Sequence, residues 1–128
     1  MGNEFPLYNP GDKETDFTFR ISMDGVSKNS VKMYLSTNQQ KDFLECRKFT
    51  KKGNDSFVRF NSKTELIEGL DSDYKPTGNI YNEYIDNGSF FKIPCTTNTD
   101  NPLKLVFDNI SFSKVTDPPA LQYDYYYL

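Results

Sequence analysis

The chain has 128 residues and a net charge of −3, with eleven Phe and nine Tyr but no Trp and no His. This length indicates a single domain, and the aromatic content of 16% argues against disorder. The lysines are scattered and form no basic patch, which argues against nucleic-acid binding. Without histidine, the chain cannot form Ser–His or Cys–His nucleophile pairs. No apolar run reaches 18 residues, which argues against membrane insertion.

The first fifteen residues are polar and contain a Pro10-Gly11 turn signal, which predicts a lead-in segment or arm. The stretch FTFRISM (17–23) then places an apolar side chain at every second position, the pattern of a half-buried strand. The same period recurs in SVKMYLS (30–36) and, less regularly, in DFLECRKF (42–49). A polar tip, KKGND, separates the latter from SFVRF (56–60), which predicts a hairpin with a long loop.

The stretch KTELIEGL (63–70) predicts the one short helix of the chain. Thr64 is placed to cap it, and Leu66, Ile67 and Leu70 would lie roughly on one side. At two turns or fewer it would contribute little stability by itself.

After this stretch, the polar residues 71–79 predict a loop, and residues 80–94 predict a second hairpin around Asp86-Asn87-Gly88. The clearest strand pattern is LKLVFDNISFS (103–113). Its apolar set shifts by one position after Asp108-Asn109, which predicts a β-bulge.

Seven or eight strand candidates with turn signals between them, and no repeat of strand and long helix, predict an all-β protein. We expect an antiparallel β-sandwich of jelly-roll or immunoglobulin-like type with at most one short helix. Three segments are expected: a lead-in or arm at 1–15, the sandwich domain at 16–115, and a Pro-Pro spacer with a tyrosine-rich strand or arm at 116–128.

The two cysteines, Cys46 and Cys95, could form a disulfide, but nothing in the sequence brings them together. The pattern favours two buried thiols in neighbouring strands. Because no CxxC motif or Cys/His cluster occurs, we expect neither a metal site nor a cofactor.

The C-terminal stretch TDPPALQYDYYYL combines a stiff proline pair with tyrosines at alternate positions. Two placements are open. The tail could close an edge of its own sandwich, or it could add as a strand to a neighbouring subunit or exchange with a second copy. In the second case the partner-binding residues are Leu121, Tyr123, Tyr125, Tyr126 and Tyr127.

Flat aromatic side chains can also stack on sugar rings, and the candidates are Tyr34, Tyr74, Tyr81 and Tyr84. The strand FDNISFS (107–113), together with FTFRISMDG followed by SVKMYLS, resembles strands of the jelly-roll carbohydrate-binding modules. The resemblance implies a β-sandwich and sugar binding. The sugar-binding tryptophans of that family have no counterpart in this chain.

The sequence thus favours a non-catalytic structural protein that docks to neighbouring subunits or copies of itself. Decoration, capsid association or attachment in a virus particle would be typical settings, with an extracellular or virion-associated location; this step is analogy. The alternative is a carbohydrate-binding module with a glycan as its partner. A small carboxylate enzyme is a third hypothesis, but a sequence does not show how far apart two carboxylates lie.

Overall fold

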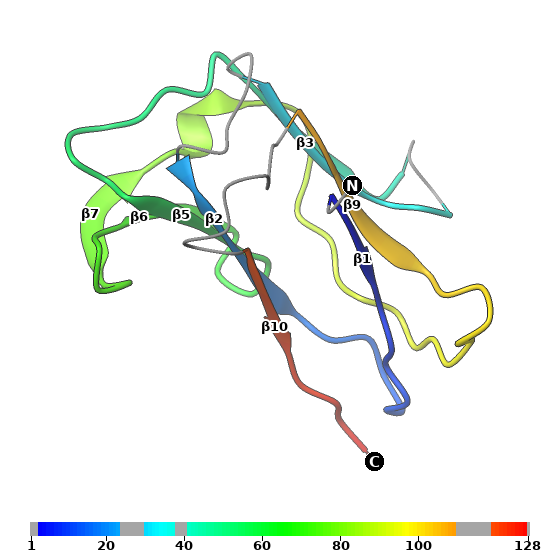
Figure 1. The fold of residues 1–128 in the computed structure, drawn as a ribbon. Coiled ribbons are helices and arrows are strands. Elements are labelled where there is room, and N and C mark those ends of the chain that lie inside the picture. The colour runs from blue at the N-terminus through cyan, green and yellow to red at the C-terminus, as the bar shows by residue number, and fades with distance from the viewer. Residues whose placement is uncertain (1–2, 24–29, 38–40, 110–118, 128) are drawn as a thin grey trace.

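The computed structural model describes residues 3–23, 30–37, 41–109 and 119–127. Within these ranges, ten strands form two antiparallel sheets that pack face to face (Figure 1). The predicted all-β sandwich is therefore confirmed.

Each sheet has five strands. The first has the order β1-β9-β3-β4-β8, with bounds β1 Glu4–Pro6, β9 Lys104–Asp108, β3 Ser30–Leu35, β4 Phe43–Arg47 and β8 Ile85–Gly88. The second has the order β10-β2-β5-β6-β7, with bounds β10 Ala120–Tyr123, β2 Phe17–Ser22, β5 Phe57–Asn61, β6 Leu66–Leu70 and β7 Pro76–Ile80. One turn of 3-10 helix, η2 at Asn82–Tyr84, follows β7.

The core lies between the sheets and is rich in aromatic rings. Phe19 of β2 stacks on Phe107 of β9 with ring centroids 4.3 Å apart, and Phe60 of β5 meets Phe107 edge-on at 5.9 Å. Strand β2 alternates buried and half-buried residues along its whole length, as its sequence predicts. Contacts between aromatic rings of opposite layers, together with the buried aliphatic side chains around them, hold the two sheets together.

The N-terminal segment belongs to the sandwich and does not extend as an arm. Strand β1 pairs with β9, with Phe5 opposite Leu105. Leu7 and Asn9 are buried, and Asn9 forms an isolated bridge with Thr96. The predicted lead-in therefore supplies an edge strand of the first sheet.

The predicted helix at 63–70 is wrong. Asn61 Oδ1 accepts the backbone N–H groups of Lys63 and Thr64, which closes a tight turn after β5. The chain then returns as β6, in which Ile67 lies opposite Phe60. Three apolar residues at nearly helical spacing also fit a strand, and the neighbouring strand β5 decides the outcome because it offers backbone partners.

The predicted loop at 71–79 is confirmed for 71–75 and wrong for 76–79. The predicted hairpins at 42–60 and 80–94 are wrong, since β4 and β5 belong to different sheets. Residues 76–80 form the edge strand β7, which pairs with β6. The chain then passes to the other sheet through η2, and β8 pairs with β4 instead of folding back on residues 89–94. Ile93 bridges to Thr15. The residues of the predicted turn, 86–88, thus lie inside strand β8.

Only the first half of the strand that was predicted to contain a β-bulge lies within the described residues. Strand β9 ends at Asp108 and Asn109 has a positive φ of 65°, while the second half of the predicted bulged strand, 110–113, lies outside the described residues.

Cys46 is buried on β4, where burial and then the charge of Glu45 raise the pKa of its thiol to about 12. Cys95 is exposed, so the prediction of two buried thiols is wrong for Cys95, and the two thiols are not bridged.

Candidate functional site

The C-terminal strand closes an edge of its own sandwich. Strand β10 pairs antiparallel with β2, with Leu121 opposite Phe19 and Tyr123 opposite Phe17. Leu121 and Tyr123 are half-buried and pack against the core. These two residues therefore do not belong to a free arm within this chain, and the first of the two placements open from the sequence is the one observed.

Beyond β10 the tail docks on residues 8–12. The Tyr123 hydroxyl accepts the N–H of Tyr8 at 3.1 Å and donates to the carbonyl oxygen of Tyr8 at 3.2 Å. The N–H of Asp12 donates to the carbonyl oxygen of Tyr126 at 2.7 Å. The side-chain hydroxyl of Tyr123 at one end and the backbone carbonyl of Tyr126 at the other hold the tail against residues 8–12, and this pair of contacts is the base from which the tyrosines project.

Gly11 permits this docking, and its replacement provides a test. A Cβ atom at Gly11 would lie 2.7 Å from the carbonyl oxygen and 2.8 Å from the nitrogen of Tyr126. We expect Gly11→Ala to displace residues 124–127 while the core remains folded, because the two shortest contacts of the added Cβ are with the tail and the next, to Asn9 Oδ1, is longer at 3.1 Å. Hydrogen exchange should show lost protection of the Asp12 N–H. A deletion of residues 124–128 serves as the matched control, and unchanged protection in Gly11→Ala would contradict the expected displacement.

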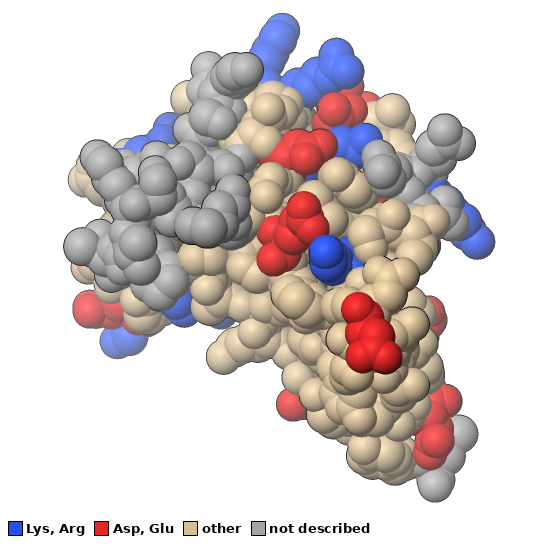
Figure 2. All heavy atoms as spheres, turned by 45° about the vertical axis from the view of Figure 1, so that its right-hand side comes forward, with Lys and Arg blue, Asp and Glu red and all other residues tan. Residues whose placement is uncertain are grey.

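Three tyrosines project from this base and form what we call the tyrosine end: Tyr8, Tyr125 and Tyr127. Their exposed fractions are 42%, 44% and 67%. The rings of Tyr8 and Tyr125 meet edge-on with centroids 6.2 Å apart. In Figure 2 the narrow lower part of the molecule, where Figure 1 places the C-terminus, shows uncharged and acidic surface.

The outer edge of β10 presents backbone hydrogen-bonding groups. In β2, the carbonyl of Phe17 and the N–H of Met23 bond toward β5, so the odd-numbered residues of β2 face β5 and the even-numbered residues face β10. The β10 partners of the even-numbered residues are Gln122, opposite Thr18, and Ala120, opposite Arg20. The N–H and C=O groups of Leu121 and Tyr123 therefore point away from β2, and no described strand pairs with them.

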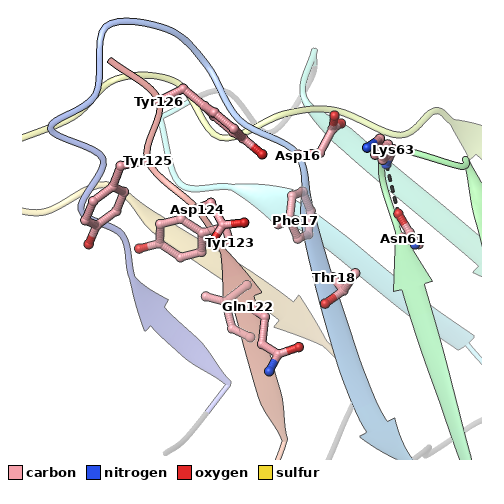
Figure 3. Close-up of a pocket in the computed structure, with 11 residues that line it drawn as sticks. Asp16, Phe17, Thr18, Asn61, Lys63, Gln122, Tyr123, Asp124, Tyr125 and Tyr126 are labelled. Carbon is pink, nitrogen blue, oxygen red and sulfur yellow. Dashed lines mark hydrogen bonds between the residues drawn. The ribbon is translucent and has the colours of Figure 1, made fainter.

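A groove lies on the other side of the tail, between it and the outer face of β2 and β5 (Figure 3). Its volume is about 830 Å³. Tyr126 leans over one end of it toward Asp16, whereas the ring of Tyr125, which also lines the groove, points the other way. Its polar lining comes from Asp16, Thr18, Asn61, Lys63, Gln122 and Asp124.

The four tyrosines proposed from the sequence to stack on sugar do not form one surface. Tyr81 is fully buried and Tyr84 packs against the core. Tyr34 lies on the outer face of β3. Tyr74, outside the opposite sheet, stacks under the Arg20 guanidinium at 3.8 Å. Because they lie in the core or on opposite faces of the sandwich, they cannot contact one ligand together.

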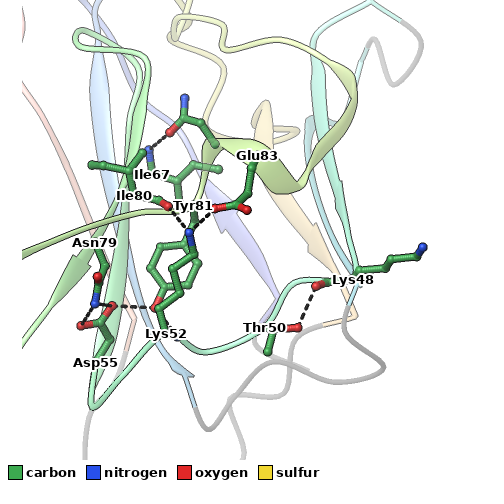
Figure 4. A network of polar contacts seen from close by, with 10 residues as sticks. Lys48, Thr50, Lys52, Asp55, Ile67, Asn79, Ile80, Tyr81 and Glu83 are labelled. Carbon is green, nitrogen blue, oxygen red and sulfur yellow. Dashed lines mark hydrogen bonds and ion pairs between the residues drawn. The ribbon is translucent and has the colours of Figure 1, made fainter.

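Sequence reasoning missed a polar network around the buried carboxylate of Asp55 (Figure 4). Its oxygens accept the hydroxyls of Tyr81 at 2.6 Å and Thr77 at 2.7 Å, together with the amide of Asn79 at 3.1 and 3.2 Å. The Tyr81 hydroxyl in turn accepts the N–H of Lys52. The only local signal was the turn-like stretch KKGND, which says nothing about partners more than twenty positions away.

This network ties the carboxylate of Asp55 to β7 and Tyr81 through hydrogen bonds. Burial acts to raise the pKa of Asp55, but the hydrogen bonds from Tyr81, Thr77 and Asn79 outweigh it and lower the pKa below its ordinary value. Burial and the bond to Asp55 raise the pKa of Tyr81. Every oxygen of the carboxylate has a donor, so the group has no capacity left for a substrate.

Comparisons with protein-family models, curated proteins and solved structures found no match. Among the described residues, no three His, Cys, Asp or Glu side chains gather in a way that could hold a metal ion. The described part of the chain also contains no helix with the length and apolar character needed to cross a membrane. The two candidate binding surfaces are therefore the tyrosine end, with the adjoining β10 edge, and the groove.

Proposed function

We propose that this protein is a non-catalytic docking module that binds a neighbouring protein through the tyrosine end. The observation that carries the proposal is the exposure of Tyr8, Tyr125 and Tyr127 where hydrogen bonds from Tyr123 and Tyr126 hold the tail against residues 8–12. Tyrosines are frequent binding hot spots because each buries a large area while losing few rotamers. A rigid base lowers the ordering cost further.

The partner is expected to dock as an extended segment. The outward backbone groups of Leu121 and Tyr123 lie next to the tyrosine end and can pair with one added strand. By contrast, β1, the edge strand of the other sheet, contains Pro6, which has no N–H to donate. Strand addition is therefore favoured at β10 over β1.

Charge favours a basic partner over a second copy of this chain. Asp124 is an exposed acid of the tail, the exposed Asp12 bonds to Tyr126 through its backbone N–H, and the whole chain has a net charge of −3. Lys13 Nζ lies 4.9 Å from the ring centre of Tyr126, an example of a cation already held by a tyrosine of this tail. Lysine or arginine side chains on the added strand would make such contacts with the tyrosine end, whereas two acidic ends would repel each other.

Selection of displayed random peptides against the immobilised full chain tests the proposal. We expect enriched peptides to be extended and basic, and binding of a selected peptide to protect the Leu121 and Tyr123 N–H groups from exchange. Replacing both Tyr125 and Tyr127 by serine should weaken the peptide Kd at least about tenfold, since hot-spot tyrosines contribute about 1–2 kcal/mol each.

Tyr74→Ser is the matched control, because Tyr74 is 42% exposed but lies outside the tyrosine end. It should leave the peptide Kd unchanged. No enriched peptide, or a peptide bound equally well by the double serine variant, would reject the proposal. A concentration-dependent dimer in sedimentation velocity that the double variant abolishes would instead assign the tyrosine end to a second copy.

A further inference from the structure

The groove behind the tail differs from the tyrosine end in its chemistry. Its floor consists of side chains on the outer face of β2, β5 and β10, where Thr18, Asn61 and Gln122 lie in one row across three strands. Its volume of about 830 Å³ is in the range of small-ligand sites, roughly 300–1,000 Å³. The protein-docking proposal makes no use of this row.

The polar groups of the floor retain unused hydrogen-bonding capacity. Asn61 uses its Oδ1 to accept the N–H groups of Lys63 and Thr64, so its amide Nδ2 remains as a donor. Asp16 accepts the Ser62 hydroxyl on Oδ1 at 3.0 Å, which leaves Oδ2 as an acceptor. No described residue hydrogen-bonds to the side chains of Thr18 and Gln122, each of which can both donate and accept.

The alternation of donors and acceptors identifies the class of ligand. A sugar hydroxyl both donates and accepts hydrogen bonds. Neighbouring sugar hydroxyls therefore match the hydroxyl of Thr18, the amide donor of Asn61 and the amide of Gln122, which lie side by side in this row. The ring of Tyr126 stands over one end of the groove and can cover the apolar face of a pyranose. A purely apolar ligand would leave the polar row without partners.

The charged residues that line the groove restrict the class of ligand further. Two carboxylates, Asp16 and Asp124, line the groove against one cation, Lys63. This balance disfavours phosphates, nucleotides, and sulfated or sialylated glycans, which need an excess of basic groups. We propose that the groove binds a neutral saccharide, with Thr18, Asn61 and Gln122 as its hydrogen-bonding floor and Tyr126 as its stacking group.

A panel of immobilised glycans, followed by titration calorimetry with the best neutral binder, tests this site on the full chain. Thr18→Val combined with Gln122→Ala should weaken the saccharide Kd at least tenfold. Both side chains are on the outer face, so the variant should keep the melting temperature of the native chain. Asn61→Asp is a sharper second variant, because it keeps the Oδ1 acceptor of the turn but replaces the free donor by an acceptor; it should weaken binding comparably.

The outcomes separate this site from the tyrosine end. Tyr127→Ser, which changes the tyrosine end but no residue that lines the groove, should keep saccharide binding, and the Thr18 and Gln122 double variant should keep peptide binding. The saccharide proposal is overturned if no glycan in the panel binds, if only acidic glycans bind, or if the Thr18 and Gln122 variant binds the neutral glycan as tightly as the native chain. None of these results would bear on protein docking.

Discussion

Gly69→Ala should lower the free energy of unfolding by about 3–5 kcal/mol, the range for breaking a buried charged network. Gly69 lies on β6 under the carboxylate of Asp55. A Cβ there would lie 2.7 Å from Asp55 Cγ and 2.9 Å from Thr77 Oγ1, and closer still to Asp55 Oδ2. The short Asp55 side chain cannot retreat without leaving its donors, and the Tyr81 hydroxyl and Asn79 amide would then lack a partner.

Urea denaturation of the two chains measures this loss. Gly53→Ala is the matched control, because Gly53 has a positive φ of 52° but only Asn79 Nδ2 nearby, at 3.7 Å. Its expected cost is about 1–2 kcal/mol, from the left-handed backbone conformation alone. If the two alanine variants were equally stable, the Asp55 network would not be the reason why glycine occupies position 69.

Asp55→Asn should cost about 2–4 kcal/mol at pH 7, and this difference from the native chain should shrink as the pH falls. Both carboxylate oxygens of Asp55 accept hydrogen bonds, so in the variant an NH2 group would face donors in either orientation of the amide. The loss at pH 7 therefore combines a missing charge with an unsatisfied donor.

The pH dependence follows from the direction of the pKa shift. The pKa of Asp55 is lowered in the folded chain, so its charge stabilises the fold fully above the unfolded pKa, about 3.9. The contribution is lost as the pH falls through the folded pKa. Unfolding free energies of native and variant chains at pH 7, 4 and 2.5 should converge. A difference that stays constant over this range would mean that Asp55 has no depressed pKa.

If both proposed surfaces bind their ligands, the C-terminal tail organises both. Tyr125 and Tyr127 belong to the tyrosine end, Asp124, Tyr125 and Tyr126 line the groove, and Tyr125 and Tyr126 project to opposite sides (Figure 3). Gly11→Ala, which displaces this stretch, should then weaken peptide and saccharide binding together, unlike the variants designed for either surface alone.

The binding surfaces could be predicted only in part. The tyrosine-rich tail was identified from its sequence, and Tyr125 and Tyr127 are exposed as a docking surface requires. That Leu121 and Tyr123 pack on β2, and that Tyr126 faces a groove, depends on how far the tail folds back. The groove floor was missed because Thr18, Asn61 and Gln122 are far apart in the sequence and share no motif. They become neighbours only because β10, β2 and β5 are adjacent in the sheet.

The sequence by itself determined the two-layer β architecture, because alternation of apolar residues is a local property of each strand and requires only a facing layer. Strands β2, β3 and β9 could be recognised in this way. Only the tertiary structure decided which segment paired with which: it turned residues 66–70 into a strand, and it joined Tyr8 to Tyr123 across 115 positions. The reason is that a short segment forms its backbone hydrogen bonds with the strand that core packing places next to it. The identity of that strand does not follow from the residues of the segment itself.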